Sequence, residues 1–321
     1  HILKERYKMS FTTDLLSIIA SALISFSFLS LATFGIVLIF KTSSTTNFAQ
    51  GMLGILGAYA TSYFIDKQGV NDLTGLPSVV ISSPWQLILP MLAGIAISFI
   101  AGLFIDVFIF RNAKYTNAGT KQIITMGLVI VITGLIPLIF GSTTRVSFAF
   151  TQKTWMLAGV ALPVHQLITL AISFILIIFI FIMLKYTKWG LGVRSVASNE
   201  RVAGLMGINT NVINALSWAI AGALGALSAM TYTAAIGTMS VMSMIDIQVN
   251  AFYASILGGF STFFGPLGGA FLLTAGQAVF PKLLVSFNLA QWSNTVLYLA
   301  IIVAVLIKPV GLFGKKIVKK V

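Results

Sequence analysis

The stretch "LITLAISFILIIFIFIML", residues 167–184, contains no charged residue and only one Thr and one Ser among apolar side chains. An α-helix needs about 20 such residues to cross a hydrocarbon core of about 30 Å. Comparable apolar stretches recur along the chain, and they cover residues 15–40, 85–110, 123–140, 212–230 and, somewhat short, 295–307. The sequence therefore predicts an all-α integral membrane protein, built as a polytopic bundle of transmembrane helices.

The composition of the whole chain agrees with this prediction. Of 321 residues, 58% are hydrophobic and only 8% are charged, whereas soluble domains carry roughly 25% charged residues. A soluble protein of this size would need far more polar surface to cover its core. The chain has no cysteine, which excludes disulfides and Cys-based metal sites. His1 and His165 are its only histidines, so no zinc site is expected.

The net charge of +13 could indicate nucleic-acid binding, but the basic residues lie in short loops and the tail. Lys and Arg accumulate on the cytoplasmic side of membrane proteins, and this rule predicts the orientation. Three basic clusters and Lys41, placed inside, account for 13 of the 20 basic residues. The clusters are Arg111, Lys114 and Lys121; Lys185, Lys188, Arg194 and Arg201; and Lys308, Lys315, Lys316, Lys319 and Lys320. The segments 67–84, 141–162, 233–248 and 281–292 then face outward.

This orientation requires an odd number of crossings before Arg111. Segments 15–40, 47–65 and 85–110 supply three, which places the N-terminus outside and predicts eight or nine crossings or half-crossings in total. The basic tail "HILKERYK", residues 1–8, argues against an outer N-terminus, and a natural start at Met9 would remove that conflict. We expect an N-terminal tail at 1–14, a transmembrane domain at 15–313 with a cytoplasmic loop at 185–211, and a basic cytoplasmic tail at 314–321.

Two segments interrupt the apolar pattern with polar residues, Gly and Pro: "NFAQGMLGILGAYA", residues 47–60, and "NAFYASILGGFSTFFGPLGGAFL", residues 250–272. Paired interrupted segments in the two halves of a transporter indicate its translocation path. Glycines also allow membrane helices to pack closely, so both interpretations remain open. The candidate path residues are Asn47, Phe48, Gln50, Gly51, Gly54, Asn250, Gly258 and Gly259.

Motifs for enzymatic chemistry are missing from the sequence. It contains no Walker pattern, G-x-S-x-G, H-E-x-x-H or paired carboxylates, so we expect neither catalysis nor ATP hydrolysis by this chain. Asp106 lies within a predicted span, and we expect it to pair with Arg111 or Lys114 near the interface rather than to relay protons. A transporter without a central ionisable relay and without its own ATPase needs an external motor.

One polar segment, "RSVASNERVAGLMGINTN" at residues 194–211, separates two apolar stretches. It predicts a helix over about 199–206, because Ser198 or Asn199 is a suitable N-cap and Glu200 complements the helix dipole. Gly207 is expected to end this helix in the left-handed conformation.

Val202, Leu205 and Met206 form one apolar stripe of this predicted helix, and we expect the stripe to pack the helix against its own spans. So short a helix is not stable alone and is too polar to insert into the membrane. It therefore requires a partner surface on the cytoplasmic side. An amphipathic loop helix lying on the lipid headgroups is the alternative.

Three stretches resemble the branched-chain amino acid ABC transporter permeases, of the first-permease type in high-affinity leucine, isoleucine and valine importers. They are "GLGVRSVASNERVAGLMGINTNVINALSWAIAGALGALSAM" (190–230), "TTNFAQGMLGILGAYA" (45–60) and "ILGGFSTFFGPLGGAFLL" (256–273). The resemblance implies a permease fold like that of type II ABC importers, whose coupling helix fits a cleft of the ATPase subunit. The implied coupling residues are Arg194, Glu200, Arg201, Ala203, Gly204, Gly207, Ile208 and Asn209.

The resemblance also implies the partners: a second permease, usually a homologous heterodimer partner, two cytoplasmic ATP-binding subunits and an extracytoplasmic substrate-binding protein. The complex would lie in the bacterial cytoplasmic membrane, with the C-terminus of this chain inside. This chain would bind no cofactor, because ATP and Mg would be used by the ATPases. The family commonly carries His and Glu around the first glycine, where this chain has Gln50 and Met52. Urea, short amides and other amino acids therefore stay open as substrates, as does a self-sufficient ion-coupled carrier or channel.

Overall fold

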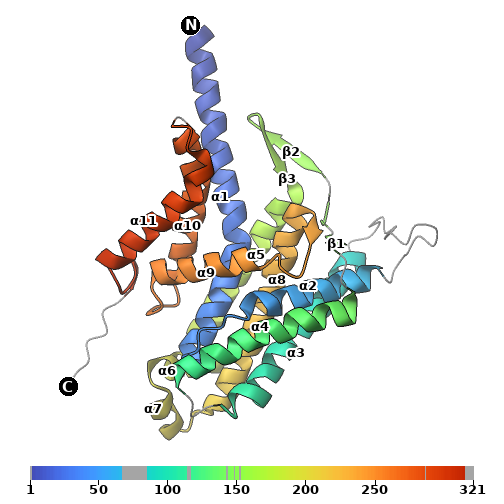
Figure 1. Ribbon diagram of the computed structural model, residues 1–321, viewed down its shortest axis with the longest axis vertical. Helices are drawn as coiled ribbons and strands as arrows, with labels where there is room; N and C mark the ends of the chain where they lie inside the picture. Colours follow the sequence, from blue (N-terminus) through green and yellow to red (C-terminus); the bar gives the residue numbers. More distant parts are fainter. Residues whose placement is uncertain are drawn as a thin grey trace.

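The computed structural model describes residues 2–66, 85–113, 117–141, 144–147, 149–151, 153–285 and 287–314, with side chains from residue 13 onward. The described chain is helical apart from two small antiparallel sheets (Figure 1). Its helices are α1 (Ile2–Ser43), α2 (Gln50–Asp66), α3 (Trp85–Phe104), the π-helix η1 (Ile105–Phe110), α4 (Ala118–Phe140), α5 (Val164–Tyr186), α6 (Lys188–Ser198), α7 (Glu200–Leu205), α8 (Thr210–Ile236), α9 (Ile245–Gly258), α10 (Gly265–Val285), the 3-10 helix η2 (Ala290–Trp292) and α11 (Ser293–Ile307). Strands β1 (Arg145–Val146) and β4 (Thr238–Met239) form one sheet, and β2 (Thr154–Leu157) and β3 (Val160–Pro163) the other.

Seven helical segments among the described residues are long and apolar enough to cross a membrane. They confirm the predicted apolar stretches, and the predicted stretch 167–184 lies inside α5. The helices α2 and α9 are shorter, with 17 and 14 residues. The first interrupted segment, 47–60, contains the start of α2, and the second, 250–272, spans the end of α9, the turn at 259–264 and the start of α10. Helix α1 already includes the residues from 2 to 14 that were expected to form a tail.

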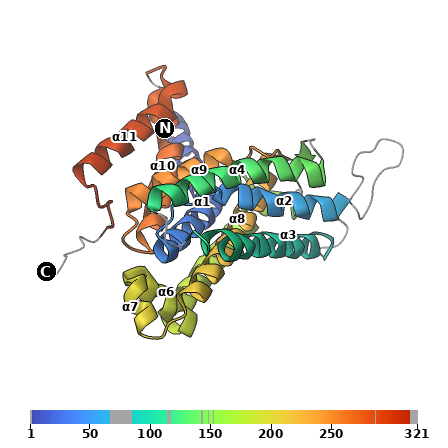
Figure 2. The same cartoon turned by 60° about the horizontal axis from the view of Figure 1, so that its bottom comes forward.

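Helices α1 and α8 form the centre of the bundle and contact each other along their length (Figure 2). The most apolar windows of these two spans are 72% and 67% buried, whereas the outer spans expose most of theirs. Small residues in α8 make this density possible, because Gly222 lies against the backbone of Ser98 in α3 and Gly225 against Gly54 in α2. Helices α2, α3 and α4 lie on one side of this pair, and α10 and α11 on the other (Figure 2).

One end of the bundle, which we call the basic end, collects positively charged residues and the helices α6 and α7 (Figure 1). There Lys41 donates to the carbonyl of Ser261 (2.6 Å), Lys121 to that of Ser43 (3.3 Å) and Arg194 to that of Lys185 (3.3 Å). Helices begin at this end with capping side chains. Asn117, Thr187, Asn199 and Asn209 each accept a backbone N–H from the first turn of α4, α6, α7 and α8.

The opposite end, which we call the hairpin end, carries the β2–β3 hairpin and the outer part of α1 (Figure 1). Lys282 in α10 forms an ion pair with Asp14 in α1 at 3.0 Å, and Arg145 pairs with Asp66 at the end of α2. Within the described residues, the arrangement therefore separates the basic residues that were predicted to face the cytoplasm from the parts of 141–162, 233–248 and 281–292 that were predicted to face outward; segment 67–84 is not described. Lys67, Lys114 and residues 315–321 lie outside the described residues.

This separation yields a prediction about orientation. The chain has no cysteine of its own, so Lys153→Cys and Lys188→Cys each provide one thiol, at exposed positions on opposite ends. We expect a membrane-impermeant maleimide to label Lys153→Cys in intact cells and Lys188→Cys only after the membrane is opened. Labelling of both variants in intact cells would show that the orientation is wrong.

Candidate functional site

The chain between α1 and α2, residues 44–49, is not helical, although it lies inside the bundle. Side chains from three segments accept its free backbone amides. Thr125 of α4 accepts the N–H of Phe48 (3.2 Å) and Asn47 accepts that of Ala49 (2.9 Å). Gln248 of α9 accepts the N–H of Gly51, the second residue of α2 (2.7 Å). Buried backbone amides need such partners, so this break depends on tertiary contacts with α4 and α9.

Three amide side chains lie at this break, and we call Asn47, Gln50 and Gln248 the amide cluster. Asn47 and Gln50 bind each other, and Gln248 binds the backbone of the break. Gln50 donates to the carbonyl of Ala221 in α8 (2.7 Å) and accepts from Asn47 (3.2 Å). Gln248 donates to the carbonyl of Phe48. Asn47 and Gln50 are fully buried, so the cluster joins α2, α8 and α9 through hydrogen bonds in a region of low dielectric.

The predicted path residues are divided by the structure into three places. Asn47, Phe48, Gln50, Gly51 and Gly54 lie together at the start of α2. Asn250 lies on α9, where it accepts a hydrogen bond from Tyr298 of α11 (2.8 Å). Gly258 and Gly259 lie at the C-terminal end of α9, against the backbones of Gly265 and Val310.

Close packing of helices accounts for each glycine in this set. A Cβ atom on Gly54 would lie 2.5 Å from the carbonyl oxygen of Gly225, and one on Gly51 would lie 2.7 Å from Gln248 Oε1. Gly259 also has φ +92°, which favours glycine. Sequence reasoning missed Gln248, although a glutamine in the short apolar helix α9 was a visible signal for a buried partner of the break.

The segment predicted to couple to a partner forms α6 and α7. Asn199 caps α7 by accepting the N–H groups of Arg201 and Val202, each at 3.1 Å. Gly207, at φ +84°, ends the helix, and the N–H of Ile208 reaches back to the carbonyl of Ala203 at 3.1 Å. This is a Schellman motif, so the predicted start and stop signals are confirmed.

The predicted direction of the apolar stripe on this helix is wrong. Val202, Leu205 and Met206 do not pack against the spans; they are 51%, 87% and 78% exposed. Ala203 is the residue of α7 that faces the bundle, where it packs with Val193, Val196 and Ile213. Its small side chain brings the helix close to the base of α8, and the larger apolar residues consequently point away. Gly204 is also exposed.

A polar pocket beneath α7 connects this helix to the spans. Asp106, Arg111, Lys121, Glu200 and Asn214 line it together with Ser43, Phe110 and Asn211. Glu200 accepts a hydrogen bond from Asn214 in α8 (3.4 Å), so its carboxylate faces the bundle rather than a partner. Asp106 is buried in the π-helix η1 and lines this pocket with Arg111 and Lys121. Its pairing with Arg111 or Lys114 stays a prediction, and Lys114 lies outside the described residues. Among the described residues no group of His, Cys, Asp and Glu could hold a metal ion.

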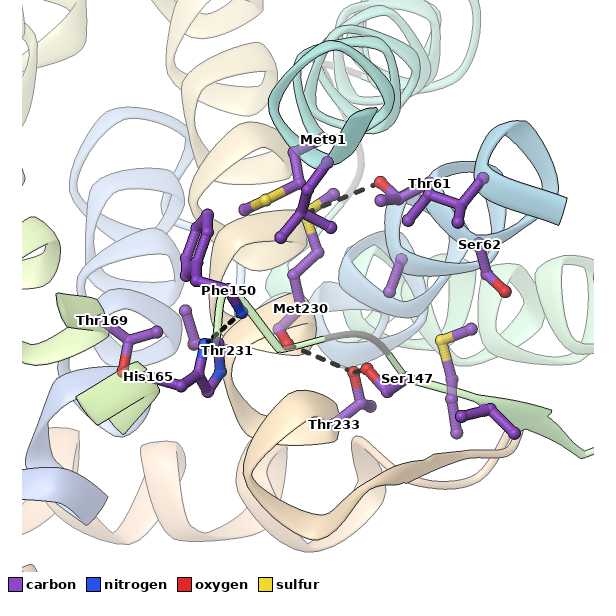
Figure 3. A pocket seen from close by; sticks show the side chains of 15 residues that line it. Thr61, Ser62, Met91, Ser147, Phe150, His165, Thr169, Met230, Thr231 and Thr233 are labelled. Atoms are coloured by element: carbon purple, nitrogen blue, oxygen red, sulfur yellow. Dashed lines mark hydrogen bonds between the residues drawn. The ribbon is translucent and has the colours of Figure 1, made fainter. Parts of the chain in front are cut away.

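A cavity lies at the hairpin end between α2, α3, α5 and α8 (Figure 3). Hydroxyl groups and His165 line one part of it, and methionine side chains line another. Val146, Ser147 and Phe150 form the cover of this cavity. Ser147 contacts Thr233 Oγ1 through its hydroxyl (3.1 Å) and donates its N–H to the carbonyl of Gly237 (3.2 Å), while Phe150 donates its N–H to His165 Nδ1 (3.0 Å).

The bundle, its broken α1–α2 connection and the exposed α7 define a polytopic membrane protein of the permease class. The sequence model of the family "Branched-chain amino acid transport system / permease component" matches residues 18–306. The chain therefore belongs to the branched-chain amino acid ABC transporter permeases, as the resemblance at residues 190–230 predicted. No solved structure gives a significant match to the fold.

Curated relatives match over nearly their whole length. The high-affinity branched-chain amino acid transport system permease protein LivH of Escherichia coli K12 is 22% identical over 293 residues, which cover 89% of this chain and 91% of the relative. BraD of Pseudomonas aeruginosa, a permease with the same description, is 23% identical, with 89% and 92% covered. The probable branched-chain amino acid transport permease protein LivH of Methanocaldococcus jannaschii is 24% identical, with 92% of each chain covered.

The contacts of Gly51 lead to a prediction for the break. Leucine at this position would push Gln248 and the carbonyl of Met244 away from α2, and overpacking of this kind costs about 1–3 kcal/mol. We expect Gly51→Leu to lower the melting temperature of the purified chain in detergent and to abolish substrate uptake by the assembled transporter. Gly127→Leu in α4 is the matched control, because a Cβ there meets nothing within 4 Å. Normal uptake and stability of Gly51→Leu would contradict the role of this contact.

Proposed function

We propose that this chain is the membrane-spanning permease subunit of an ATP-driven importer that moves leucine, isoleucine and valine. The exposed apolar face of α7 carries this proposal. Val202, Leu205 and Met206 point away from the bundle at the end where the basic residues gather. A rigid, capped helix that exposes three large apolar side chains outside the spans needs a partner surface to cover them.

The surroundings of α7 support docking of a folded subunit rather than of lipid. Beside it lies an open groove of about 600 Å³, which Leu191, Val202, Met206 and Ile208 line together with Arg194 and the polar residues Ser195, Ser198 and Asn199. Anchor residues in a pocket with a polar rim are typical of protein interfaces. We infer that one cytoplasmic ATP-binding subunit docks in this groove. A second ATP-binding subunit would dock in the same way on a second, homologous permease.

The substrate proposal rests on the family and on the chemistry of the break. The relatives are described as branched-chain amino acid transport permeases. The amide cluster carries no charge, and the described spans around it are apolar. Such a path suits a small zwitterion with an aliphatic side chain, delivered by an extracytoplasmic binding protein, and no cofactor would be bound by this chain.

Uptake in proteoliposomes tests this function. We expect liposomes that contain this chain, its second permease and both ATPases to accumulate radiolabelled leucine, when the binding protein is outside and ATP is inside. Omission of ATP or of the ATPases should stop uptake. ATP-independent leucine uptake by this chain alone would identify a carrier or channel instead. ATP-driven uptake of urea but not of leucine would show that the proposed substrate is wrong.

Docking at α7 makes a second prediction. A Cβ on Gly204 meets only the methyl group of Thr210, at 3.9 Å, so arginine at this exposed position leaves the fold of the free chain intact. In a close interface it would bury an unpaired charge, which costs several kcal/mol, enough to weaken the complex a hundredfold or more. We expect Gly204→Arg to lose the ATPases on co-purification and Gly204→Ala to retain them. If Gly204→Arg co-purifies with the ATPases in full and keeps substrate-stimulated ATP hydrolysis, α7 is not a docking helix, and the alternative of a helix lying on lipid headgroups is correct.

A further inference from the structure

His165 is the one buried imidazole of the described chain, and it lies in the cavity at the hairpin end (Figure 3). The residue is the second of α5 and only 5% exposed. Its ring packs beside that of Phe150, with centroids 5.3 Å apart. The imidazole has two nitrogens with different surroundings, and this difference determines what the side chain can bind.

The hydrogen bond from Phe150 fixes the tautomer of the ring. His165 Nδ1 accepts the backbone N–H of Phe150 at 3.0 Å, so this nitrogen carries no proton. A neutral imidazole then holds its proton on Nε2. His165 Nε2 is buried and has no hydrogen-bond partner within the part of the chain that the structure describes. A buried N–H donor without an acceptor costs free energy, and an acceptor from outside the chain would remove that cost.

Other lining groups add polar capacity beside this donor. The hydroxyl of Ser62, on α2 across the cavity, is also buried without a hydrogen-bond partner among the described residues. The hydroxyls of Thr169 and Thr231 lie beside the imidazole in Figure 3. The residues that line the cavity include no Asp, Glu, Lys or Arg. Neutral donors bind an anionic group without trapping it, as a transport path requires.

The rest of the wall is apolar and deformable. Leu87 and Met91 of α3 and Met230 of α8 line it together with Ala58, Ile65 and Met239. Methionine side chains are flexible and adapt to the shape of their neighbours. The cavity therefore combines hydroxyl groups and one free N–H with apolar side chains. A carboxylate can accept from the N–H, an ammonium group can donate to hydroxyl oxygens, and an aliphatic side chain can pack against the methionines.

We propose that this cavity is a transient binding site on the import path, where His165 Nε2–H donates a hydrogen bond to the carboxylate of the substrate and the methionine wall receives its aliphatic side chain. The proposal rests on the proposed function. In the present conformation the cavity holds about 30 Å³, too little for an amino acid. Entry therefore requires Ser147 and Phe150 to move from their contacts with Thr233, Gly237 and His165.

Site-directed labelling inside the cavity tests this site. Because the chain has no cysteine, Ser62→Cys places a single thiol there. In the assembled transporter, with and without ATP, we expect methyl methanethiosulfonate to modify this thiol and millimolar leucine to slow the reaction at least fivefold. Leucinamide, which lacks the carboxylate, should give no protection. A thiol that no nucleotide state exposes, or equal protection by both compounds, would overturn the proposal.

Two substitutions of His165 separate ligand binding from support of the cover. Asparagine keeps an acceptor near Nδ1 for the N–H of Phe150 and removes Nε2. Glutamine places an amide donor near Nε2 and gives up the contact with Phe150. In the Ser62→Cys background we expect His165→Asn to need about tenfold more leucine for half-protection, or about 1.4 kcal/mol, and His165→Gln to stay near the parent value. The reverse order would make His165 a structural support only.

Parallel uptake measurements separate this proposal from the proposed function. ATP-driven leucine uptake without protection of the Ser62→Cys thiol would remove the cavity site and leave the importer. Protection by leucine but not leucinamide, in a complex that accumulates no leucine, would keep the binding site and remove the proposed transport function. If leucine is not accumulated and does not protect the thiol, both the cavity site and the proposed transport function are overturned.

Discussion

The structure depends on the satisfaction of backbone amides at a helix break inside the bundle. The chain leaves α1 at Ser43 and enters α2 at Gln50, and most of the residues between them are buried or half-buried, so their backbone amides need partners within the protein. Thr125, Asn47 and Gln248 accept the amides of Phe48, Ala49 and Gly51. Helices α4 and α9 must therefore hold their positions for the break to exist, and Gln50 fastens the same place to α8.

The break is also continuous with the helix that we assign to docking. Ser43 lies at its start, where its hydroxyl accepts from the indole of Trp218 (3.1 Å) and its carbonyl accepts from Lys121. Trp218 stacks on Phe110 of η1, and one turn before it on α8 Asn214 donates to Glu200 of α7. A movement of α7 against α8 would thus act on the polar pocket, on η1 and on the end of α1. This continuity is a physical route from a docked ATPase to the break, which links the two features that the sequence singled out.

Local signals in the sequence predicted what depends on local physics. The apolar stretches, the Asn199 cap, the Gly207 stop and the separation of basic residues all follow from length, helix termini and charge, and the structure contains them. The direction of the α7 stripe did not follow, because the helix is oriented by Ala203 packing on α6 and α8. Periodicity shows that an apolar face exists, but not whether the chain itself or a partner covers it.

Tertiary partners account for the remaining differences. Gly54 and Gly258 lie against the backbones of Gly225 and Gly265, and these contacts could not be predicted from the sequence. The role of Gly54 and Gly258 in the translocation path stays a prediction. The sequence also gave no reason to connect Gln248 to Gly51, which lies 197 positions away, or His165 to a cavity between four helices. Such residues acquire their role only when distant segments meet.

Site-specific photocrosslinking from position 205 in native membranes tests the central claim, that α7 is the docking element of an ATP-driven permease. Leu205 of α7 is 87% exposed, and a photoreactive amino acid there samples whatever covers the helix. The account predicts one main adduct, with the combined mass of this chain and an ATP-binding subunit. The same photoreactive amino acid in place of Ile130, on the exposed face of α4, should not give this adduct. Lipid adducts alone from position 205 would contradict the account.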